Sequence, residues 1–372
     1  MDAKRYLVGI IHSCKTLARL HQAKRQFDER KSSHQLNYLF WETTLRCNLT
    51  CRHCGSRCSP DEVRDDELTT EEAKDVFANI ASGFNSQEIT VAVTGGEPLL
   101  RKDLFEIMSF AADLGFWWGV VTNGTLVTKK MVKKMRQAKM ATVSISLDGD
   151  AEAHAFLRGS KEYFEKGLNA VSMLRESGFL DRVQVTTVVH KKNVDLLAKM
   201  YDIFHERGCQ EWRLLMADPI GRMRDKENSD FILDGAGLKK LLEFVADKRE
   251  NPGPMDVTFE ESGFLGLDFE GRVRDYFFHC PAGIEIASVL YDGAISACPS
   301  LPRSLVEGNV RTDDFATVWQ EKFQRFRDRE GTRRKGPCES CMWWQYCEGG
   351  SLHLWDWELD EPRLCHYRLL NE

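Results

Sequence analysis

Short runs of β-branched and aromatic residues alternate with longer amphipathic stretches from Tyr38 onward. A run of this kind predicts a buried strand, and an amphipathic stretch with apolar residues three and four positions apart predicts a helix. Repeated strand–helix alternation is typical of a parallel sheet wound by helices, either open or curled into a barrel. The six runs cover residues 38–44, 88–94, 116–122, 142–147, 183–189 and 212–216.

The pattern changes on both sides of this region. Residues 1–37 are rich in basic residues and carry apolar residues on one helical face, which favours a packed helical extension over an RNA-binding or membrane-lying arm. Residues 38–245 form the predicted core, and residues 246–279 are irregular and charged, which predicts a linker or bridging region. Residues 280–372 have few apolar runs but six cysteines, as in a small domain in which metal replaces a large core.

Composition and charge exclude several classes of protein. The 372 residues are 42% hydrophobic and 29% charged, which suffices for one large core or two modest ones. A net charge of −6 provides no overall basic field, so we expect no nucleic-acid and no membrane partner. The apolar stretches are far shorter than the roughly 20 residues of a membrane span, and no secretory signal is evident at the start of the sequence. These features predict a cytoplasmic protein.

The twelve cysteines are unevenly distributed. In a reducing cytosol, clustered cysteines are more often metal ligands or catalytic thiols than disulfide partners. Cys14 and Cys209 are isolated, which is typical of small buried hydrophobic residues. The other ten fall into three sets, namely Cys47, Cys51, Cys54 and Cys58; Cys280 and Cys298; and Cys338, Cys341, Cys347 and Cys365.

The first set has the spacing Cys47-x-x-x-Cys51-x-x-Cys54, directly after the first predicted strand. The carboxyl ends of parallel strands are where α/β folds place their sites. Three thiolates on a cubane iron–sulfur cluster leave one iron with an open position for a substrate or cofactor. Zinc is the alternative, with His53 or Cys58 as its fourth ligand. Cys58 itself is interpreted as a structural cysteine or as a redox-active thiol.

Two segments resemble the radical S-adenosylmethionine (SAM) enzymes. These are Cys47-Asn48-Leu49-Thr50-Cys51-Arg52-His53-Cys54 and the turn Thr94-Gly95-Gly96-Glu97-Pro98 at the end of the second strand, within a resemblance that covers about residues 38–222. It implies a partial (β/α)6 barrel, a [4Fe-4S] cluster on the three cysteines and SAM chelated by the fourth iron. It also implies that the turn contacts the methionine amino group of SAM. In agreement, two glycines permit close backbone approach, and a glutamate accepts hydrogen bonds from an ammonium group.

Further residues at the strand ends have expected roles from the same resemblance. Segments ending the third and fourth strands are expected to line the SAM pocket, with the region of Ser146 and Asp148 near the ribose. Arg158 is expected to pair with the SAM carboxylate, although a surface arginine near a helix start is the alternative. Leu215 and Met216 would pack against the adenine, or belong to the core. The cofactor-binding candidates are Gly95, Gly96, Glu97, Pro98, Thr122, Asn123, Ser146, Asp148, Arg158 and Met216.

The last cysteines resemble the SPASM domain, an auxiliary cluster domain of many peptide-modifying radical SAM enzymes. The resemblance implies that one auxiliary [4Fe-4S] cluster is held by Cys338, Cys341, Cys347 and Cys365, a full ligand set that suits electron transfer or a structural role. Cys280 and Cys298 remain for a second, inner cluster, but Ser351 stands where the family has a further ligand. Pro299 replaces an aspartate that acts as a base in sulfatase-maturing relatives, which disfavours formylglycine formation.

These features together predict a radical SAM enzyme that cleaves SAM to methionine and a 5′-deoxyadenosyl radical, which abstracts hydrogen from a substrate. The resemblance implies a ribosomally made peptide or protein side chain as substrate and a flavodoxin- or ferredoxin-type reductant. A small molecule or cofactor precursor is the alternative substrate. The alternative from another class is a non-catalytic iron–sulfur electron carrier or metal-stabilised scaffold. The Gly-Gly-Glu-Pro turn argues against that alternative, because a carrier has no need for a methionine-binding turn.

Overall fold

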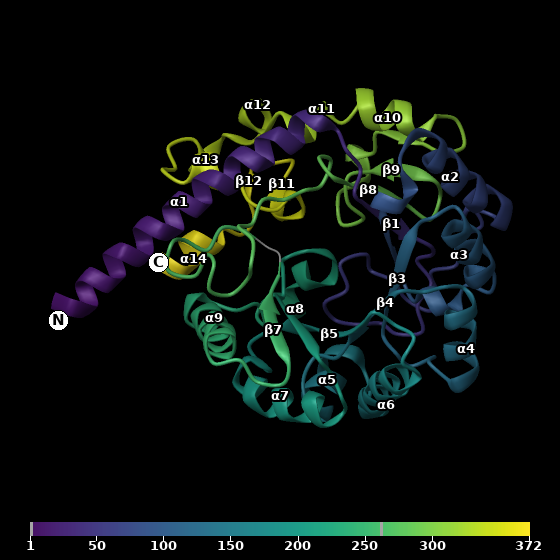
Figure 1. The fold of residues 1–372 in the computed structure, drawn as a ribbon, viewed down its shortest axis with the longest axis horizontal. Helices are drawn as coiled ribbons and strands as arrows, with labels where there is room; N and C mark the ends of the chain where they lie inside the picture. Colours follow the sequence, from purple (N-terminus) through teal and green to yellow (C-terminus); the bar gives the residue numbers. More distant parts are fainter. Residues whose placement is uncertain (1–2, 261–262) are drawn as a thin grey trace.

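The fold is known from a computed structural model that describes residues 3–260 and 263–372, with side chains described from residue 14 onward. A single ten-stranded sheet runs through most of the chain, and helices α2 to α7 lie along its outer side (Figure 1). The structure therefore has the α/β class predicted from the alternation of strands and helices.

The six predicted strands form six consecutive parallel strands. They are β1 (Tyr38–Glu42), β2 (Thr90–Thr94), β3 (Trp117–Thr122), β4 (Thr142–Ser146), β5 (Arg182–Val189) and β6 (Glu211–Met216). The sheet order is β10-β9-β8-β1-β2-β3-β4-β5-β6-β7. The added strands are β7 (Asp256–Phe259), β8 (Ile286–Val289), β9 (Ala294–Ser296) and β10 (Gly308–Asn309), and a separate pair consists of β11 (Trp355–Asp356) and β12 (Glu361–Pro362).

The helices connect the strands and cover the sheet. Several begin at a side-chain cap; for example, Thr69 and Glu72 form a reciprocal capping box at the start of α2. The α-helices are α1 (Ala3–Ser33), α2 (Thr70–Gly83), α3 (Leu104–Asp113), α4 (Lys129–Gln137), α5 (Ala151–Arg158), α6 (Lys161–Ser177), α7 (Leu197–Glu206), α8 (Lys226–Ser229), α9 (Gly235–Glu250), α10 (Phe315–Glu321), α11 (Gln324–Arg327), α12 (Arg329–Arg333), α13 (Trp344–Cys347) and α14 (His366–Asn371). Short 3-10 helices are η1 (Ser86–Glu88), η2 (Pro98–Leu100), η3 (Val194–Leu196), η4 (Gly221–Arg224), η5 (Arg303–Leu305), η6 (Gly336–Cys338) and η7 (Leu352–Leu354).

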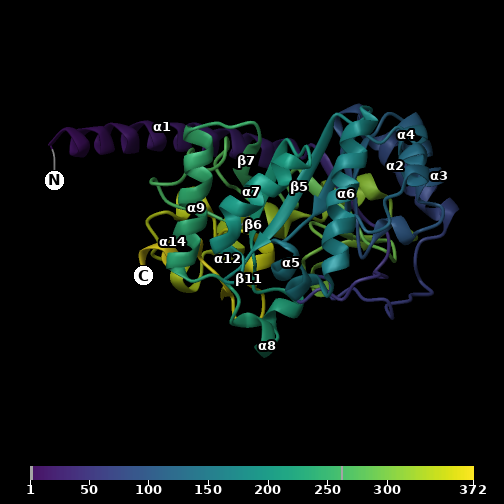
Figure 2. The same cartoon turned by 90° about the horizontal axis from the view of Figure 1, so that it is seen from below.

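The later turns of helix α1 lie against the rest of the molecule (Figure 2). Leu20 and Phe27 are buried along its later turns, so this part packs against the protein. The side chains of Leu7, Ile10 and Ile11, which belong to the predicted apolar face, lie outside the described side chains. Among the described residues, no helix is both long and apolar enough to cross a membrane.

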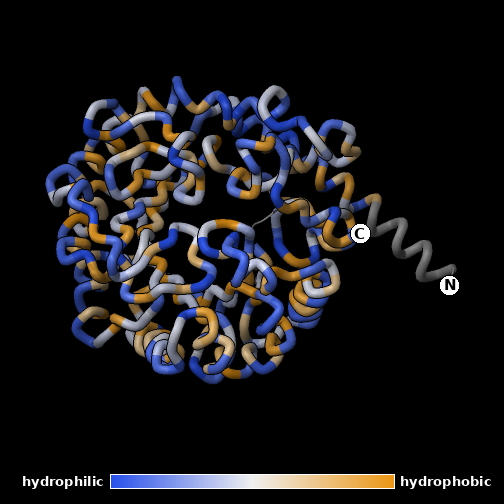
Figure 3. The backbone as a smooth tube through the Cα atoms, turned by 180° about the vertical axis from the view of Figure 1, so that it is seen from behind, coloured by the Kyte–Doolittle hydropathy of each residue, from blue (hydrophilic) through white to orange (hydrophobic). Residues whose placement is uncertain are grey.

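One hydrophobic core runs from the sheet into the C-terminal part of the chain. Trp41 of β1, Trp118 of β3 and Trp319 of α10 are all nearly fully buried in it. Along the outer helices hydrophobic and hydrophilic positions alternate, as expected for helices with one face on a core (Figure 3). The strand region and the start of the cysteine-rich region therefore share a core.

Two predicted segment boundaries do not coincide with breaks in the structure. Residues 246–279, predicted as a linker or bridging region, contain the end of α9 and strand β7, which pairs in parallel with β6. Residues 280–372, predicted as the auxiliary cluster domain, include β8, which pairs in parallel with β1, so this segment shares the sheet with the core. An unpaired strand edge favours the addition of another strand, and β8 covers this edge of β1. The four-residue β7 was too short to stand out from the surrounding charged residues.

Candidate functional site

The loop after β1 places the thiols of Cys47, Cys51 and Cys54 around one cavity of about 320 Å³ at the carboxyl ends of the parallel strands. This is the position predicted from the strand order. Six of the predicted cofactor-binding residues also line the cavity, namely Gly95, Gly96, Thr122, Asn123, Ser146 and Arg158.

Backbone contacts hold this loop in place. The N–H of Cys47 donates to the carbonyl of Ser59 over 3.0 Å, and the N–H of Cys54 donates to the carbonyl of Cys51 over 3.3 Å. Arg222, which follows β6, donates from Nε to the Cys51 carbonyl over 2.7 Å and from Nη2 to the Cys58 carbonyl over 2.8 Å. Arg222 therefore links the cysteine loop to the segment that follows β6.

Each of the three sulfurs accepts a hydrogen bond, and their environments differ. Leu49 N–H donates to Cys47 Sγ over 3.4 Å, and Arg158 Nη1 donates to Cys51 Sγ over 3.9 Å. Burial raises the pKa of Cys47 to about 12 and also raises the pKa of Cys51, where Arg158 opposes the shift. A hydrogen bond from Cys58 lowers the pKa of Cys54 to about 6.

The glycines of the Gly95-Gly96 turn are required by backbone packing. Gly95 has φ +131°, and a Cβ there would lie 2.4 Å from the carbonyl oxygen of Thr44. A Cβ on Gly96 would lie 2.1 Å from the carbonyl oxygen of Arg46. We expected these glycines to permit close approach of a ligand. The structure shows that they permit close approach of the cysteine loop itself, and both residues still face the cavity.

Glu97 and Pro98 differ from their expected positions. Glu97 is fully buried, and its carboxylate accepts hydrogen bonds from Thr122 Oγ1 over 2.8 Å, Asn123 N–H over 2.9 Å and Leu99 N–H over 3.2 Å. Neither Glu97 nor the buried Pro98 is among the residues that line the cavity. The carboxylate thus links the turn after β2 to the end of β3 through hydrogen bonds. The predicted hydrogen bond was one from the ammonium group of a ligand.

Asp148 and Arg158 form a buried ion pair beside the cysteines. Asp148 is fully buried and accepts from Val188 N–H over 2.8 Å, whereas only Arg158 of the pair reaches the cavity. Although burial alone would raise the pKa of Asp148, the guanidinium of Arg158 lowers it to about 2. Asp148 was expected to lie near a ribose, but the structure places it behind Arg158. His53 Nε2 lies 3.3 Å from Arg158 Nη2, so this nitrogen is directed at a cation and is poorly placed as a zinc ligand.

Leu215 rather than Met216 faces the cavity on β6. Successive side chains of a strand point to opposite faces, and Leu215 lines the cavity while Met216 is 2% exposed in the core. The prediction of an adenine contact therefore moves from Met216 to Leu215. The sequence did not distinguish them, because both are apolar.

The four cysteines near the C-terminus line a second, smaller cavity of about 50 Å³. They come from η6, the turn after it, α13 and the residue before α14, so the chain folds back on itself to bring them together. Burial raises the pKa of Cys338 to about 11 and that of Cys347 to about 12, which is the penalty that bound metal offsets by stabilising the thiolates. This four-thiol cavity matches the predicted outer ligand set Cys338, Cys341, Cys347 and Cys365.

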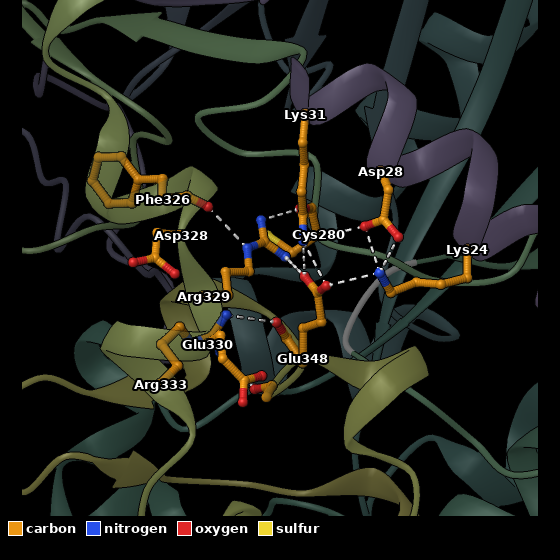
Figure 4. A network of polar contacts seen from close by, with 12 residues as sticks. Lys24, Asp28, Lys31, Cys280, Phe326, Asp328, Arg329, Glu330, Arg333 and Glu348 are labelled. Carbon is orange, nitrogen blue, oxygen red and sulfur yellow. Dashed lines mark hydrogen bonds and ion pairs between the residues drawn. The ribbon is translucent and has the colours of Figure 1, made fainter. Parts of the chain in front are cut away.

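Cys280 and Cys298 line neither of these two cavities. The carbonyl oxygen of Cys280 accepts a hydrogen bond from Arg329, in a network that also contains Glu348 and Lys31 of α1 (Figure 4). Burial would raise the pKa of Glu348, but Arg329 and Lys31 hold it below its usual value. Cys280 thus lies beside an ionic link between α1 and the C-terminal region, and the predicted inner cluster on these two cysteines gains no support from this placement.

The sequence patterns did not identify several residues that line the site. Arg213, Arg222 and Ser300 line the cysteine cavity, and a neighbouring cavity of about 480 Å³ shares Ser300 with it. Glu42 lines the neighbouring cavity of about 480 Å³, and burial raises the pKa of its carboxyl group to about 7. An acidic residue at the end of an apolar strand is the signal that could have identified Glu42, whereas the arginines had no distinguishing pattern.

Replacing Gly96 by Ala tests the backbone contact that positions the cysteine loop. The new Cβ would overlap the Arg46 carbonyl, and the resulting shift is expected to cost about 1–3 kcal/mol of unfolding free energy and to lower iron incorporation. Urea unfolding and iron analysis after anaerobic reconstitution measure both. Gly178→Ala is the control, since its Cβ meets no atom within 4 Å and only the left-handed backbone is strained. Equal iron contents of the two variants would contradict the prediction.

Comparison with known proteins agrees with this arrangement. A sequence model of the Radical SAM superfamily matches residues 41–204, and a model of an iron–sulfur cluster-binding domain, SPASM, matches residues 280–342. The second match includes Cys338 and Cys341, and Cys347 and Cys365 follow its end.

Three similar proteins illustrate the range of relatives. The AdoMet-dependent heme synthase of Methanosarcina barkeri is 29% identical, over 88% of this chain and 95% of the relative. The mycofactocin maturase MftC of Mycolicibacterium smegmatis is also 29% identical, over 84% of this chain and 77% of the relative. The structure of Streptococcus suis SuiB bound to the precursor peptide SuiA superposes with a TM-score of 0.68 at 17% identity, over 94% of this chain and 76% of SuiB. At that identity the last similarity concerns the fold alone.

Proposed function

Because the chain belongs to the radical SAM superfamily and carries a SPASM cluster-binding domain, we propose that this enzyme abstracts hydrogen from a side chain of a ribosomally made peptide or protein. Its cofactors are SAM, a SAM-binding [4Fe-4S] cluster and an auxiliary cluster. We infer that Cys47, Cys51 and Cys54 hold the first cluster, and that Cys338, Cys341, Cys347 and Cys365 hold the auxiliary cluster.

One observation carries this assignment: Cys47, Cys51 and Cys54, with Cys58 beside them, line one cavity, and four further cysteines line another. Three thiolates leave an iron free for SAM, and four close a cluster completely. A scaffold or simple electron carrier has no use for the open position, which favours the enzyme over that alternative.

The bound cofactors supply reductive cleavage of SAM and so a carbon radical that takes hydrogen from the substrate. The protein positions and shields this chemistry. Arg158, held by Asp148, presents a buried positive charge to the cavity, where it is placed to bind a carboxylate. Gly95 and Gly96 bring the turn after β2 against the cysteine loop, and Leu215 contributes an apolar wall.

A peptide substrate is supported by one sequence relative, and a protein of similar fold provides a precedent. MftC is named a maturase, and SuiB was crystallised with a precursor peptide. We further propose a flavodoxin- or ferredoxin-type reductant and a cytoplasmic location, where a reducing environment keeps the ten clustered cysteines available as ligands.

A second candidate is a small-molecule or cofactor-precursor substrate. It is favoured by the heme synthase relative, because the match covers 95% of that protein and leaves little of its length without a counterpart here. Glu42, a buried acid with a pKa near neutrality in the neighbouring cavity, would serve either substrate as a proton acceptor.

Anaerobically reconstituted protein tests the proposal directly. With SAM and dithionite, the full chain should release 5′-deoxyadenosine, measured by liquid chromatography. Co-expression with each short open reading frame beside the gene should change the mass of one encoded peptide, and the Cys47→Ala variant should leave that mass unchanged. Formation of heme from an added porphyrin precursor, without any change in the peptides, would instead favour the small-molecule candidate.

A further inference from the structure

The cavity of about 480 Å³ beside the cysteine cavity has a charge balance unlike that of the whole chain. Among the described residues that line it, Glu42 is the one acid and the cations are all arginines. The chain as a whole has 57 acidic residues against 51 lysines and arginines. The residues that define this arginine cavity are Arg57, Arg64, Arg224, Arg303 and Arg363. Positive charge gathered in one cavity of an acidic chain favours a ligand that carries negative charge.

The five arginines come from distant parts of the chain. Two follow the cysteine loop, Arg224 ends η4, Arg303 begins η5 and Arg363 follows β12. The fold brings these segments around one cavity, and no run of charges in the sequence predicts it. The arginine cavity is therefore a feature of the tertiary structure alone.

The guanidinium groups of this cavity are available to a ligand. Arg57 pairs with Asp225 and Arg303 with Asp292, but these two arginine side chains are 53% and 51% exposed. Exposed ion pairs contribute little to stability, so a ligand carboxylate can replace the aspartate at small cost. Arg224 is exposed and forms no ion pair with any residue that the structure describes. Its positive charge is therefore not offset within the described part of the protein.

The rest of the lining suits an organic acid better than a bare ion. Leu45, Leu290 and Leu301 add apolar wall, and the guanidinium carbon of Arg303 lies 5.6 Å from the centre of the Tyr291 ring. A guanidinium stacked on a ring has a defined plane, and its parallel N–H donors match the two oxygens of a carboxylate. Apolar wall together with forked donors favours a carboxylate carried on a carbon skeleton.

The arginine cavity adjoins the cysteine cavity. Gly55, Ser56, Ile220 and Ser300 line both. At this junction a Cβ on Gly55 would lie 3.1 Å from Ile220 Cδ1, so the glycine lets the cysteine loop pack closely against the segment after β6. A molecule held by the arginines therefore lies directly beside the place proposed for SAM.

Resting on the proposed function, which places hydrogen abstraction in the cysteine cavity, we propose that the arginine cavity binds the substrate through its carboxylate groups, with Arg224 and Arg303 as the main anchors. The substrate is therefore acidic. An acidic peptide segment and a small molecule with several carboxylates share this chemistry. Anchoring by the arginines holds the substrate at the edge of the cysteine cavity, where its other parts can reach the radical.

Fluorescence anisotropy of the anaerobically reconstituted full chain tests this proposal with two rhodamine-labelled peptide amides, tetraglutamate and tetraglutamine. At roughly 0.1 M salt, which screens charges beyond about 10 Å, the wild type should bind tetraglutamate about tenfold more tightly or better. Arg224→Gln should remove most of this preference, and Arg224→Lys should keep part of it, because an ammonium retains the charge but not the fork. Arg25→Gln is the matched control, since Arg25 is also exposed, lies outside the arginine cavity and forms no ion pair with a described residue.

Unlabelled competitors identify the source of the carboxylates. Displacement of the labelled peptide at a lower concentration of pyromellitate, a small tetracarboxylate, than of tetraglutamate assigns the cavity to a small acid, and the reverse order assigns it to a peptide. Displacement by inorganic phosphate at a lower concentration than by either carboxylate probe would overturn carboxylate recognition.

The outcomes separate this inference from the proposed function. Equal binding of the two labelled peptides, or an Arg224→Gln variant that binds tetraglutamate as tightly as the Arg25→Gln control, would overturn the inference. A wild-type protein that releases 5′-deoxyadenosine without preferring the acidic probe contradicts this inference alone. One that prefers the acidic probe through Arg224 but does not cleave SAM contradicts the proposed function, while the carboxylate site stands.

Discussion

Replacing Cys47, Cys51 and Cys54 together by Ala is expected to reduce the iron content from about eight to about four per chain and to abolish SAM cleavage. All three thiols face one cavity, and no other set of thiols borders it except the neighbouring Cys58. Without these ligands the cluster that reduces SAM has no attachment. Iron and sulfide analysis together with a 5′-deoxyadenosine assay under dithionite measures both effects.

The reciprocal variant controls for general damage. The double variant Cys341→Ala with Cys347→Ala should lose the other half of the iron and still cleave SAM slowly. If the triple variant continued to produce 5′-deoxyadenosine, the assignment of Cys47, Cys51 and Cys54 would be wrong. Limited proteolysis should show an intact sheet in the triple variant, because these residues lie in a loop outside the main core.

The double variant Cys341→Ala with Cys347→Ala is expected to lose the auxiliary cluster and to unfold locally. Cys347 is partly buried, and four thiols from η6 to α14 line a cavity of about 50 Å³. A bound cluster would link these elements in addition to the packing of Trp343 against Tyr367. From the sequence alone, in which metal replaces a large core over residues 280–372, loss of the metal was expected to unfold this whole segment. The structure narrows this to residues after about Arg333, because β8 and α10 belong to the main sheet and core.

Three measurements on the double variant check this prediction. Iron should fall by about four per chain, proteolytic cleavage should appear after α12, and substrate turnover should fail while slow SAM cleavage persists. An unchanged iron content, or a C-terminal segment as protease-resistant as in the wild type, would refute the ligand role. The ionic link from Lys31 to Glu348 should keep α1 attached only while α13 remains folded.

The candidate site could be found in the sequence because the three cysteines proposed as its ligands are close together along the chain. Cys47, Cys51 and Cys54 lie within one loop after an apolar strand, so local spacing and strand order suffice to place them at a sheet edge. The glycine turn after β2 was likewise found from the sequence, but the structural reason for its two glycines was not. Only the structure shows that the space excluded by the glycines belongs to the Thr44 and Arg46 carbonyls.

The sequence by itself determined the α/β sheet and the grouping of the cysteines into local sets with the spacing of ligands, because these signals depend on local periodicity and residue type. Only the tertiary structure decided which side chains face the cavity. Glu97 and Asp148 turn away to satisfy buried donors and a guanidinium, and alternation along β6 selects Leu215 over Met216. Local patterns also do not predict the pairing of β8 with β1, which lie about 250 residues apart in the chain. This pairing consists of backbone hydrogen bonds at an unpaired strand edge, and many different sequences can form such bonds.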